Sequence, residues 1–329
     1  MTMVEFFMEP EWDQPFFKRL AKNDTGSAQS NQSGMLLPVE LRQYLPTLDE
    51  AATSESTPTT DRRLSVELFL GTIRVGSNVV RYQFQTRAGK RRPESWITHP
   101  KGESGWHPLW DVATQGDLIL FQRRSDVTDR FRMILVRQDT PEFSEITTYV
   151  NARTCGSLFL GAQPVTQADI TMASTEIDSL VLQPFHATLP ETKRVLTRQT
   201  RLARCPVFSS RVRNEYRFKC AVSGINIATP AELHEVEAAH VVPLNRGGPD
   251  DIRNGLSLTQ TLHWAFDRGL FGVKHDRTIF IPKRVSRMTH NAFLRQYEGK
   301  PITEAKTASL QVHKDAFEWH METIVAEWK

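Results

Sequence analysis

The sequence predicts an α+β protein in which a mostly β domain precedes a smaller domain of short strands and helices. Three observations lead to this fold class. Segments between residues 65 and 138 alternate apolar and polar residues, as strands with one buried face do. Residues 234–282 read as short strands around a glycine-rich loop and one helix, and residues 307–329 have helical periodicity. We expect domains at 1–184 and 211–329, joined by a basic helical linker at 185–210.

The first domain is predicted from strand-like segments separated by turn residues. Strands are expected at 65–75, 78–86, 117–124 and 131–138, and Gly, Ser and Asp fill the intervals. Residues 14–38 offer a short helix or strand, then a polar loop, then an apolar strand. Residues 53–62 are expected to form an exposed loop, and residues 165–184 a helix that closes the domain.

The second domain is predicted to begin with a charged helix that leads into YRFKCAVSG at 216–224. A strand is expected over 234–244, a glycine loop over 245–251, and a strand followed by a helix over 256–269. Two more strands are expected over 270–282. The C-terminal helix would present one apolar face, formed by Leu310, Phe317, Met321, Ile324, Val325 and Trp328.

Composition is typical of a soluble globular protein. The 329 residues are 39% hydrophobic and 24% charged, and no apolar run is long enough to cross a bilayer. The first residues lack the pattern of a secretory signal, so we expect a cytoplasmic protein of a prokaryotic cell without a membrane partner. Three scattered cysteines without a CxxC pair predict neither a disulfide framework nor a structural zinc site.

Positive charge is concentrated in two stretches, although the net charge is only +3. Residues 193–219 contain nine Lys or Arg and one acid, and the segment RAGKRRPESW covers 87–96. Such clusters suit contact with phosphates, and Arg211 and Arg217 are candidates for it. The alternative is a solvated helix face and a basic loop.

The segment from Glu235 to Leu270 carries residue types suited to phosphodiester hydrolysis. That reaction needs a base for the attacking water and a cation that stabilises the phosphate. The neutral imidazole of His240 suits the base. His263 and Asp267 are four residues apart on the expected helix, so they share a face and can bind one divalent ion. Asn254 is suited to tying the glycine loop to the backbone.

This segment resembles the HNH endonucleases, whose ββα-metal site is a two-stranded hairpin packed on a helix around one metal ion. The resemblance covers about Arg211 to Pro282. It implies that His240 is the general base, Asn254 the residue that stiffens the hairpin, and His263 a metal ligand. Asp267 would match a further helix ligand found in some branches. Mg²⁺ or Mn²⁺ is the expected cofactor, with other transition metals left open.

The sequence departs from that family at Ala239. Many HNH enzymes carry an Asp or His ligand immediately before the base, and alanine cannot bind metal. Glu237 lies two residues earlier, on the same side of a strand as Ala239, and is the candidate replacement. The alternative is a degenerate nuclease domain that binds DNA without cutting it.

The first domain resembles the N-terminal DNA-recognition domain of the EcoRII restriction endonuclease family, a β pseudobarrel with two DNA-binding arms. The phrases KRLAKNDTGSAQSNQSGMLLP and RAGKRRPESWIT carry this resemblance over about Phe16 to Val136. Asn31 and Leu36 stand where the best-known member has a histidine and a tyrosine, which leaves the target sequence open. Lys, Arg and Glu read G·C pairs in the major groove. Together with Arg211 and Arg217, the predicted DNA contacts are Lys18, Arg19, Asn23, Asp24, Thr25, Asn31, Lys90, Arg91, Arg92 and Glu94.

Together, the two resemblances imply a type II-like restriction endonuclease that recognises a DNA sequence. We expect it to cut by metal-dependent hydrolysis and to leave 5′-phosphate and 3′-hydroxyl ends. The expected partners are double-stranded DNA, a second copy of the chain in a homodimer, and a cognate DNA methyltransferase in the same system. Two alternatives stay open: an HNH nuclease that senses modified bases or is regulated by an effector, and a non-catalytic DNA-binding regulator.

Overall fold

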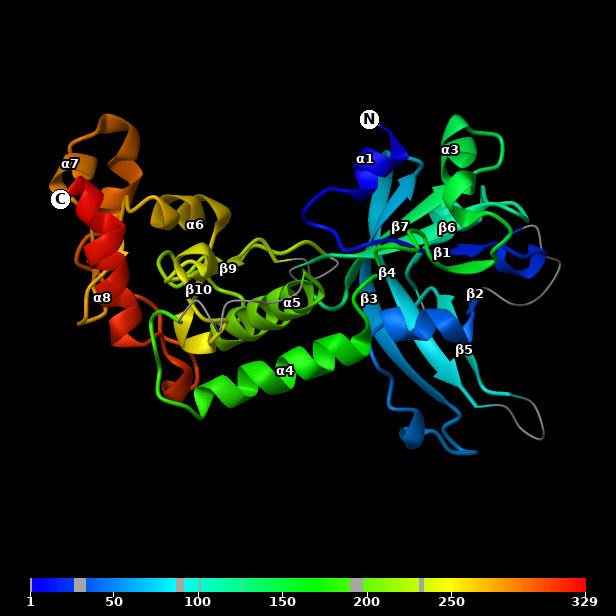
Figure 1. Ribbon diagram of the computed structural model, residues 1–329, viewed down its shortest axis with the longest axis horizontal. Coiled ribbons are helices and arrows are strands. Elements are labelled where there is room, and N and C mark those ends of the chain that lie inside the picture. Colours follow the sequence, from blue (N-terminus) through cyan, green and yellow to red (C-terminus); the bar gives the residue numbers. More distant parts are fainter. Residues whose placement is uncertain are drawn as a thin grey trace. The chain divides into compact units, whose positions relative to one another are not determined.

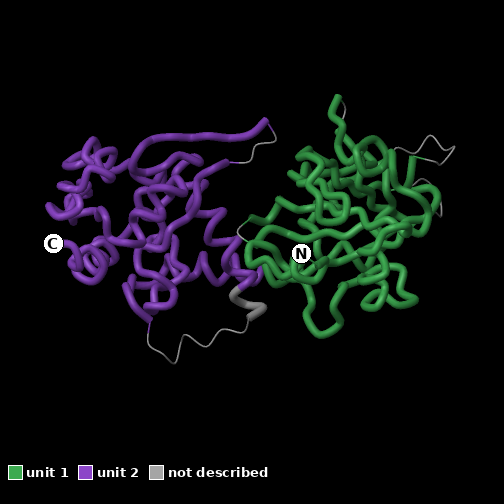
Figure 2. Tube along the Cα trace, turned by 90° about the horizontal axis from the view of Figure 1, so that it is seen from above, with its two compact units in different colours: residues 1–170 green, residues 171–329 purple. Residues whose placement is uncertain are grey.

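The structure is a computed structural model that describes residues 2–26, 34–86, 92–100, 102–125, 127–189, 198–230 and 234–329, with the main chain alone for 198–201. It contains two compact units, Met1–Ile170 and Thr171–Lys329 (Figure 2). Helix α4 (Gln167–Val181) confirms the helix expected over 165–184; it begins in unit 1 and continues into unit 2. Among the described residues, no helix is long and apolar enough to span a membrane.

Unit 1 is built on one curled eight-stranded sheet (Figure 1). The strand order is β2-β5-β4-β3-β7-β6-β1-β8, in which β3 and β7 run parallel and all other neighbours run antiparallel. The strands are β1 (Phe16–Arg19), β2 (Gly34–Leu37), β3 (Thr59–Leu70), β4 (Ile73–Gln85), β5 (Glu94–Thr98), β6 (Leu118–Arg123), β7 (Arg130–Val136) and β8 (Cys155–Ser157).

Most of the strands expected between residues 65 and 138 are present, and three details differ. The strand expected over 65–75 is interrupted, because Gly71 has a φ of 58° and turns the chain from β3 into β4. Strand β3 also begins at Thr59, within the expected loop at 53–62. Strand β5 adds a further strand to this part of the sheet.

The middle of the sheet is apolar on both faces. Along β6, Ile119 and Phe121 belong to one hydrophobic cluster, whereas Leu118 and Leu120 belong to the other, as strand alternation requires. The first cluster also contains residues of η2 (Val39–Tyr44) and α2 (His107–Trp110). The second contains residues of α1 (Met3–Phe7) and α3 (Pro141–Val150). Two short 3₁₀ helices, η1 (Lys22–Asp24) and η3 (Glu50–Ala52), complete the unit.

Unit 2 contains a small hairpin between helices (Figure 1). Strands β9 (Glu237–His240) and β10 (Gly255–Leu258) pair antiparallel, with Gly255 opposite His240. Their connection holds two single 3₁₀ turns, η5 (Leu244–Arg246) and η6 (Ile252–Asn254). Helices α5 (Arg198–Glu215) and α6 (Gln260–Asp267) pack on the hairpin, so the strand, loop, strand and helix order expected from the sequence is confirmed.

The remaining elements follow α6. They are β11 (Gly272–Val273), β12 (Ile279–Phe280), α7 (Lys283–Ser286), η7 (Thr289–Tyr297), η8 (Ala308–Leu310), α8 (Lys314–Thr323) and η9 (Val325–Trp328). The single C-terminal helix expected over 307–329 is therefore wrong in extent, because Gln311 has extended backbone and separates η8 from α8. Phe317 and Val325 on its predicted apolar face are buried.

Two glycines allow the close packing around the hairpin. A Cβ on Gly255 would lie 2.2 Å from Cγ2 of Val212, so α5 approaches β10 only because the side chain is absent. A Cβ on Gly248 would lie 1.8 Å from the carbonyl oxygen of Val242. The glycine loop can therefore fold back over the end of β9, which is where His240 lies.

Candidate active site

His240 is fixed from two sides at the end of β9. Its ring stacks on Phe208 of α5, with centroids 3.9 Å apart and planes 10° apart. Its Nε2 lies 3.1 Å from Oδ1 of Asp250, a buried carboxylate in the glycine loop. The side chain keeps 17% exposure. A histidine held in one orientation with one nitrogen engaged is suited to proton transfer through the other nitrogen.

Asn254 is fully buried and ties the glycine loop to β9. Its Oδ1 accepts from the backbone N–H of Val242 at 2.9 Å. Its Nδ2 donates to the carbonyl oxygens of Val242 and Pro249, both at 3.0 Å. These bonds match the loop-tying role anticipated from the sequence. They hold together the two ends of the loop that places Asp250 against His240.

His263 lies on α6 between two carboxylates. Its Nδ1 is 2.8 Å from Oε2 of Glu237, and its Nε2 is 3.5 Å from Oδ2 of Asp267. Burial alone would lower the pKa of His263. The hydrogen bond to Glu237 and the charges of Asp267 and Glu237 outweigh it, so the pKa lies above its usual value. Burial raises the pKa of Asp267, and the nearby His263, Arg268 and His240 oppose that rise.

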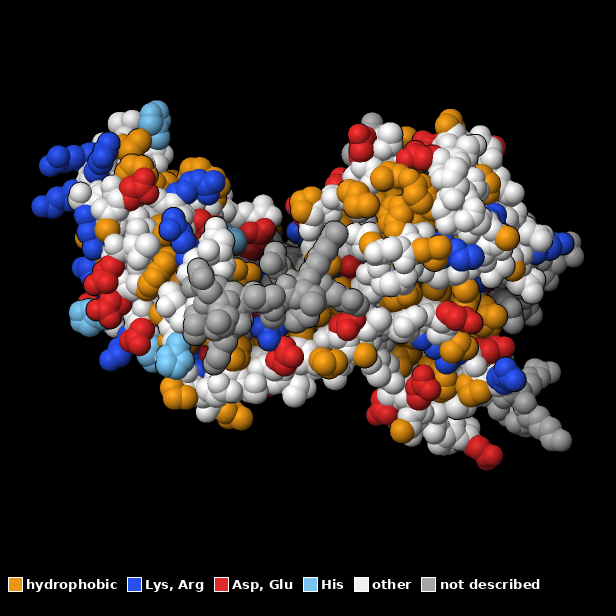
Figure 3. Space-filling view, in the orientation of Figure 1, with side chains coloured by type: hydrophobic (Ala, Val, Ile, Leu, Met, Phe, Trp, Pro, Cys, Tyr) orange, Lys and Arg blue, Asp and Glu red, His pale blue; other side chains and the backbone are white. Residues whose placement is uncertain are grey.

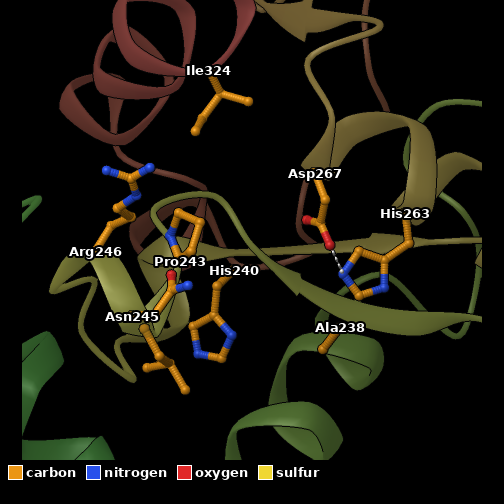
Figure 4. Close-up of a pocket in the computed structure, with 9 residues that line it drawn as sticks. Ala238, His240, Pro243, Asn245, Arg246, His263, Asp267 and Ile324 are labelled. Carbon is orange, nitrogen blue, oxygen red and sulfur yellow. Dashed lines mark ion pairs between the residues drawn. The ribbon is translucent and has the colours of Figure 1, made fainter.

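The candidate residues open onto one pocket of about 550 Å³ (Figure 4). The pocket is lined by His240, at the end of β9, and by His263 and Asp267, both on α6. The complete lining is Ala238, His240, Pro243, Leu244, Asn245, Arg246, His263, Asp267 and Ile324. The structure thus brings the predicted base and the two predicted helix ligands to one cavity, large enough for a phosphate group and water.

The donor set facing this pocket suits a hydrated divalent ion. Within the described residues, no group of three or more His, Cys, Asp or Glu side chains is arranged to hold a metal ion. His263 and Asp267 are a pair of donors on an open pocket. Mg²⁺ commonly keeps several waters and takes only one or two carboxylates from the protein, the rest coming from substrate phosphates. An ion held by this pair therefore fits the residues present.

Ala239 and Glu237 lie on the strand side opposite Ala238 and His240. Ala239 is fully buried opposite Leu256 in the hairpin, so its position offers no ligand. Glu237 is a third exposed and holds Nδ1 of His263. A carboxylate on the second nitrogen of a metal-binding histidine fixes the tautomer and the ring. This geometry favours Glu237 as the residue that orients His263; direct contact with an ion stays a prediction.

Three side chains predicted to belong to the first DNA arm are engaged in contacts within unit 1. Lys18 and Asp24 are buried and form an ion pair, and Asp24 also accepts from the backbone N–H groups of Ala21 and Leu36. Burial lowers the pKa of Lys18, and Asp24 opposes this. Thr25 is buried and donates to the carbonyl oxygen of Lys22. These three side chains stabilise the turn around η1, and their contact with DNA stays a prediction.

The other predicted DNA contacts of unit 1 are less enclosed. Arg19 is partly buried and donates to the carbonyl oxygen of Gly116, whereas Asn23 and Arg92 are exposed. Glu94 is partly buried at the start of β5. The predicted contacts at Asn31, Lys90 and Arg91 lie outside the described residues.

The basic run at 193–219 is partly neutralised by acids of α4. Arg204 pairs with Glu176 at 2.6 Å, and Arg211 pairs with Asp178 at 2.8 Å. Arg213 is buried. Arg217 is exposed and follows α5 with a φ of 52°. Lys193 and Arg194, and the side chains of Arg198 and Arg201, lie outside the described part of the chain. Two of the nine cations in the run, Arg204 and Arg211, therefore join α5 to α4.

Two residues of the site were not predicted from the sequence. Phe208 is an apolar residue of an arginine-rich helix, and nothing in that pattern marks it as a partner of His240. Asp250 is one of two adjacent acids in the loop NRGGPDD. A local signal for it existed, because an acid placed between the base and Asn254 in a glycine loop can reach either strand end.

Comparison with known proteins supports the prediction of an HNH endonuclease segment in unit 2. Residues 220–274 match the model of the HNH endonuclease family (HNH_2), and this match includes β9, the glycine loop, β10 and α6. Among solved structures, the chain is similar to a modification-dependent TagI restriction endonuclease. The identity is 12%, the likeness covers 92% of this chain and 80% of that one, and the TM-score is 0.32. A similarity of that size bears on neither fold nor function. No curated protein matches the chain.

Proposed function

We propose that this chain is a DNA endonuclease whose unit 2 hydrolyses phosphodiester bonds. One observation carries the proposal. His240, held by Asp250 and Phe208, opens onto the pocket that His263 and Asp267 also line, and all but Phe208 lie within the segment that matches the HNH endonuclease model. A base and a pair of metal donors on one open pocket are what metal-assisted hydrolysis requires.

His240 acts as the general base in this proposal. Its Nε2 is engaged by Asp250, so Nδ1 receives the proton of the attacking water. Glu237 holds Nδ1 of His263, which leaves Nε2 beside Asp267 as the nitrogen available to an ion. His263 and Asp267 would hold a divalent metal ion, Mg²⁺ or Mn²⁺, which would supply positive charge to the phosphate and the leaving 3′ oxygen. The products are 5′-phosphate and 3′-hydroxyl ends.

Unit 1 supplies sequence recognition in this proposal, through an EcoRII-like pseudobarrel. Arg92 is exposed and Glu94 begins β5, so an arm containing both can present an arginine and a carboxylate to G·C pairs. A single pocket of this kind cuts one strand. Cleavage of both strands then requires a homodimer or two binding events, and a matching DNA methyltransferase protects the host genome in a type II restriction system.

The test is cleavage of plasmid DNA by the full chain with Mg²⁺ or Mn²⁺, compared with His240→Ala. We expect His240→Ala to slow cutting by about 10²- to 10⁴-fold while DNA binding is retained. His275→Ala changes an exposed histidine outside the pocket and serves as the matched control. Wild-type protein that binds DNA but never nicks it with either metal would establish the non-catalytic regulator instead.

A further series separates restriction from the sensing of modified bases. Methylated and unmethylated DNA of the same sequence are cut in parallel, and the ends are mapped on a genome-scale mixture. A type II enzyme cuts the unmethylated DNA at one defined sequence. Cutting that requires methylation would establish the modification-sensing alternative.

A further inference from the structure

A basic surface outside the HNH-matched segment covers α7 and η7. Residues 282–300 contain five Lys or Arg and a single acid, Glu298. The five cations are exposed, and we call them the basic face: Lys283, Arg284, Arg287, Arg295 and Lys300. Figure 3 shows Lys and Arg side chains gathered where Figure 1 places α7.

The charge of this face is available for an external partner. None of its five cations forms an ion pair with a carboxylate of the described chain. Glu298 accepts from the backbone N–H of Ile281 at 2.7 Å, so the only acid in the segment is engaged. In the basic run of α5, by contrast, Arg204 and Arg211 are paired with acids of α4. Unpaired cations on an exposed surface attract a polyanion.

A hydrogen bond between η7 and α7 and buried apolar side chains fix the conformation of the basic face. Nε of Arg295 donates to the carbonyl oxygen of Ser286 at 2.7 Å and fixes η7 against α7. Val285 and Leu294 are buried beneath the two elements. Met288 and Phe293, which lie among these cations in the sequence, are also exposed. The five cations are therefore attached to backbone that is held in place by packing.

The same face is linked to the pocket through Trp328. Arg284 lies over the Trp328 ring, 5.6 Å from its centroid. The indole Nε1 of Trp328 donates to the carbonyl oxygen of Arg268, the residue after Asp267 of the pocket. Arg268 is itself exposed and lies over the ring of exposed Trp264. Trp328 thus connects Arg284 of the basic face to the residue that follows Asp267 of the pocket.

We infer that the basic face binds the phosphate backbone of double-stranded DNA beside the candidate active site. This inference rests on the proposed function for its choice of DNA. Exposed Lys and Arg contacts to phosphates position a duplex without reading its sequence, and each contact releases counterions. The face would hold the duplex while His240 acts on the bond placed in the pocket.

The test measures binding of the full chain to a short DNA duplex of arbitrary sequence, without metal, over a series of salt concentrations. The test variant is Lys283→Gln/Arg287→Gln. The control is Lys306→Gln/Lys314→Gln, which removes two exposed cations of unit 2 outside the face; Nζ of Lys306 lies 3.8 Å from Oε1 of Glu215. We expect the test variant to bind about tenfold more weakly at moderate salt. The slope of log Kd against log salt should fall by about two. The control should keep both values.

Each outcome bears on the inference separately from nuclease activity. Equal salt slopes for wild-type protein and the test variant, with equal unfolding temperatures, would overturn it even if the chain cuts DNA. A slope change restricted to duplex RNA would overturn the choice of DNA. A slope change with duplex DNA supports the face even if the wild-type chain fails to nick, in which case only the proposed function falls.

Discussion

Nε2 of His240 lies 3.1 Å from Oδ1 of Asp250, and Oδ2 of the same carboxylate lies 3.9 Å from Nη1 of Arg204. An ionised carboxylate only accepts hydrogen bonds, so Asp250 requires a proton on Nε2 of His240. The lone pair of the neutral ring is then on Nδ1. In the proposed mechanism, Asp250 is therefore a positioning residue that selects the tautomer able to take a proton from water.

Replacing Asp250 with Asn should change the tautomer of His240 without changing the stability of the fold. The Asn amide can donate to Nε2 and favour the tautomer with its proton on Nδ1, which cannot act as a base. We expect Asp250→Asn to lower the single-turnover cleavage rate by about 100-fold or more, with DNA affinity and unfolding temperature retained.

Asp276→Asn is the control for that variant, because it makes the same chemical change at an exposed position outside the pocket. It should cut at the wild-type rate. A wild-type rate for Asp250→Asn would show that the contact between His240 and Asp250 does not determine the tautomer used in catalysis.

The local part of the site could be predicted from the sequence, whereas its tertiary contacts could not. The spacing of His263 and Asp267 puts both on one helix face by geometry alone, and Asn254 follows a glycine loop that needs tying. The contact between Asp250 and His240 depends on Gly248 approaching the carbonyl oxygen of Val242, which spacing does not reveal. Phe208 contacts His240 from α5, a helix well separated from β9 in the sequence, so no local sequence pattern identifies this contact.

Charge patterns were less informative than periodicity. A cluster of Lys and Arg in the sequence does not show whether acids elsewhere neutralise it. Arg204 and Arg211 are paired with α4, and Lys18 is buried against Asp24. The unpaired basic face at 283–300 has a similar composition. Only the fold distinguishes a structural arginine from one that is available to a partner.

Glu237 provides a test of the metal site. Changing Glu237 to Gln keeps an acceptor for Nδ1 of His263 but removes the negative charge that makes the ring a stronger ligand. We expect the Mn²⁺ concentration for half-maximal cutting to rise by about 10- to 100-fold, with a similar loss of Mn²⁺ affinity by calorimetry. Glu322→Gln, exposed on α8, is the control. Unaltered Mn²⁺ affinity in Glu237→Gln would contradict this role.

Arg92 provides a test of the recognition arm in unit 1. If Arg92 donates to guanine, Arg92→Ala should lose about 1–3 kcal/mol of discrimination at one base pair. Metal-dependent nicking should persist, because the change lies in unit 1 and the pocket in unit 2. Arg62→Ala removes another exposed arginine of the same unit as a control. The readout is the set of mapped cut sites, and an unchanged set would argue against the arm.

His320 on α8 predicts how stability depends on pH. The side chain is buried, stacks on Phe266 with centroids 3.9 Å apart, and bonds to the Phe266 carbonyl oxygen through Nε2. Its Nδ1 has no hydrogen-bond partner among the described residues. Burial lowers the pKa of His320 from 6.5 to about 4, and the bond to Phe266 only partly opposes this. The folded chain therefore holds His320 neutral at pH values where the unfolded chain protonates it.

The stabilising contribution of neutral His320 is complete above pH 6.5 and is lost as pH falls toward about 4. We expect the free energy of opening α8 to drop by about 2 kcal/mol between pH 7 and pH 5 from this residue alone. Hydrogen exchange of the α8 amides, corrected for intrinsic exchange rates, measures it. His320→Phe keeps the stacking and removes the titrating group, so its pH dependence should be flatter, whereas exposed His275→Gln should behave as wild type. If the free energy of opening α8 depends on pH equally in wild type and His320→Phe, a group other than His320 causes the pH dependence.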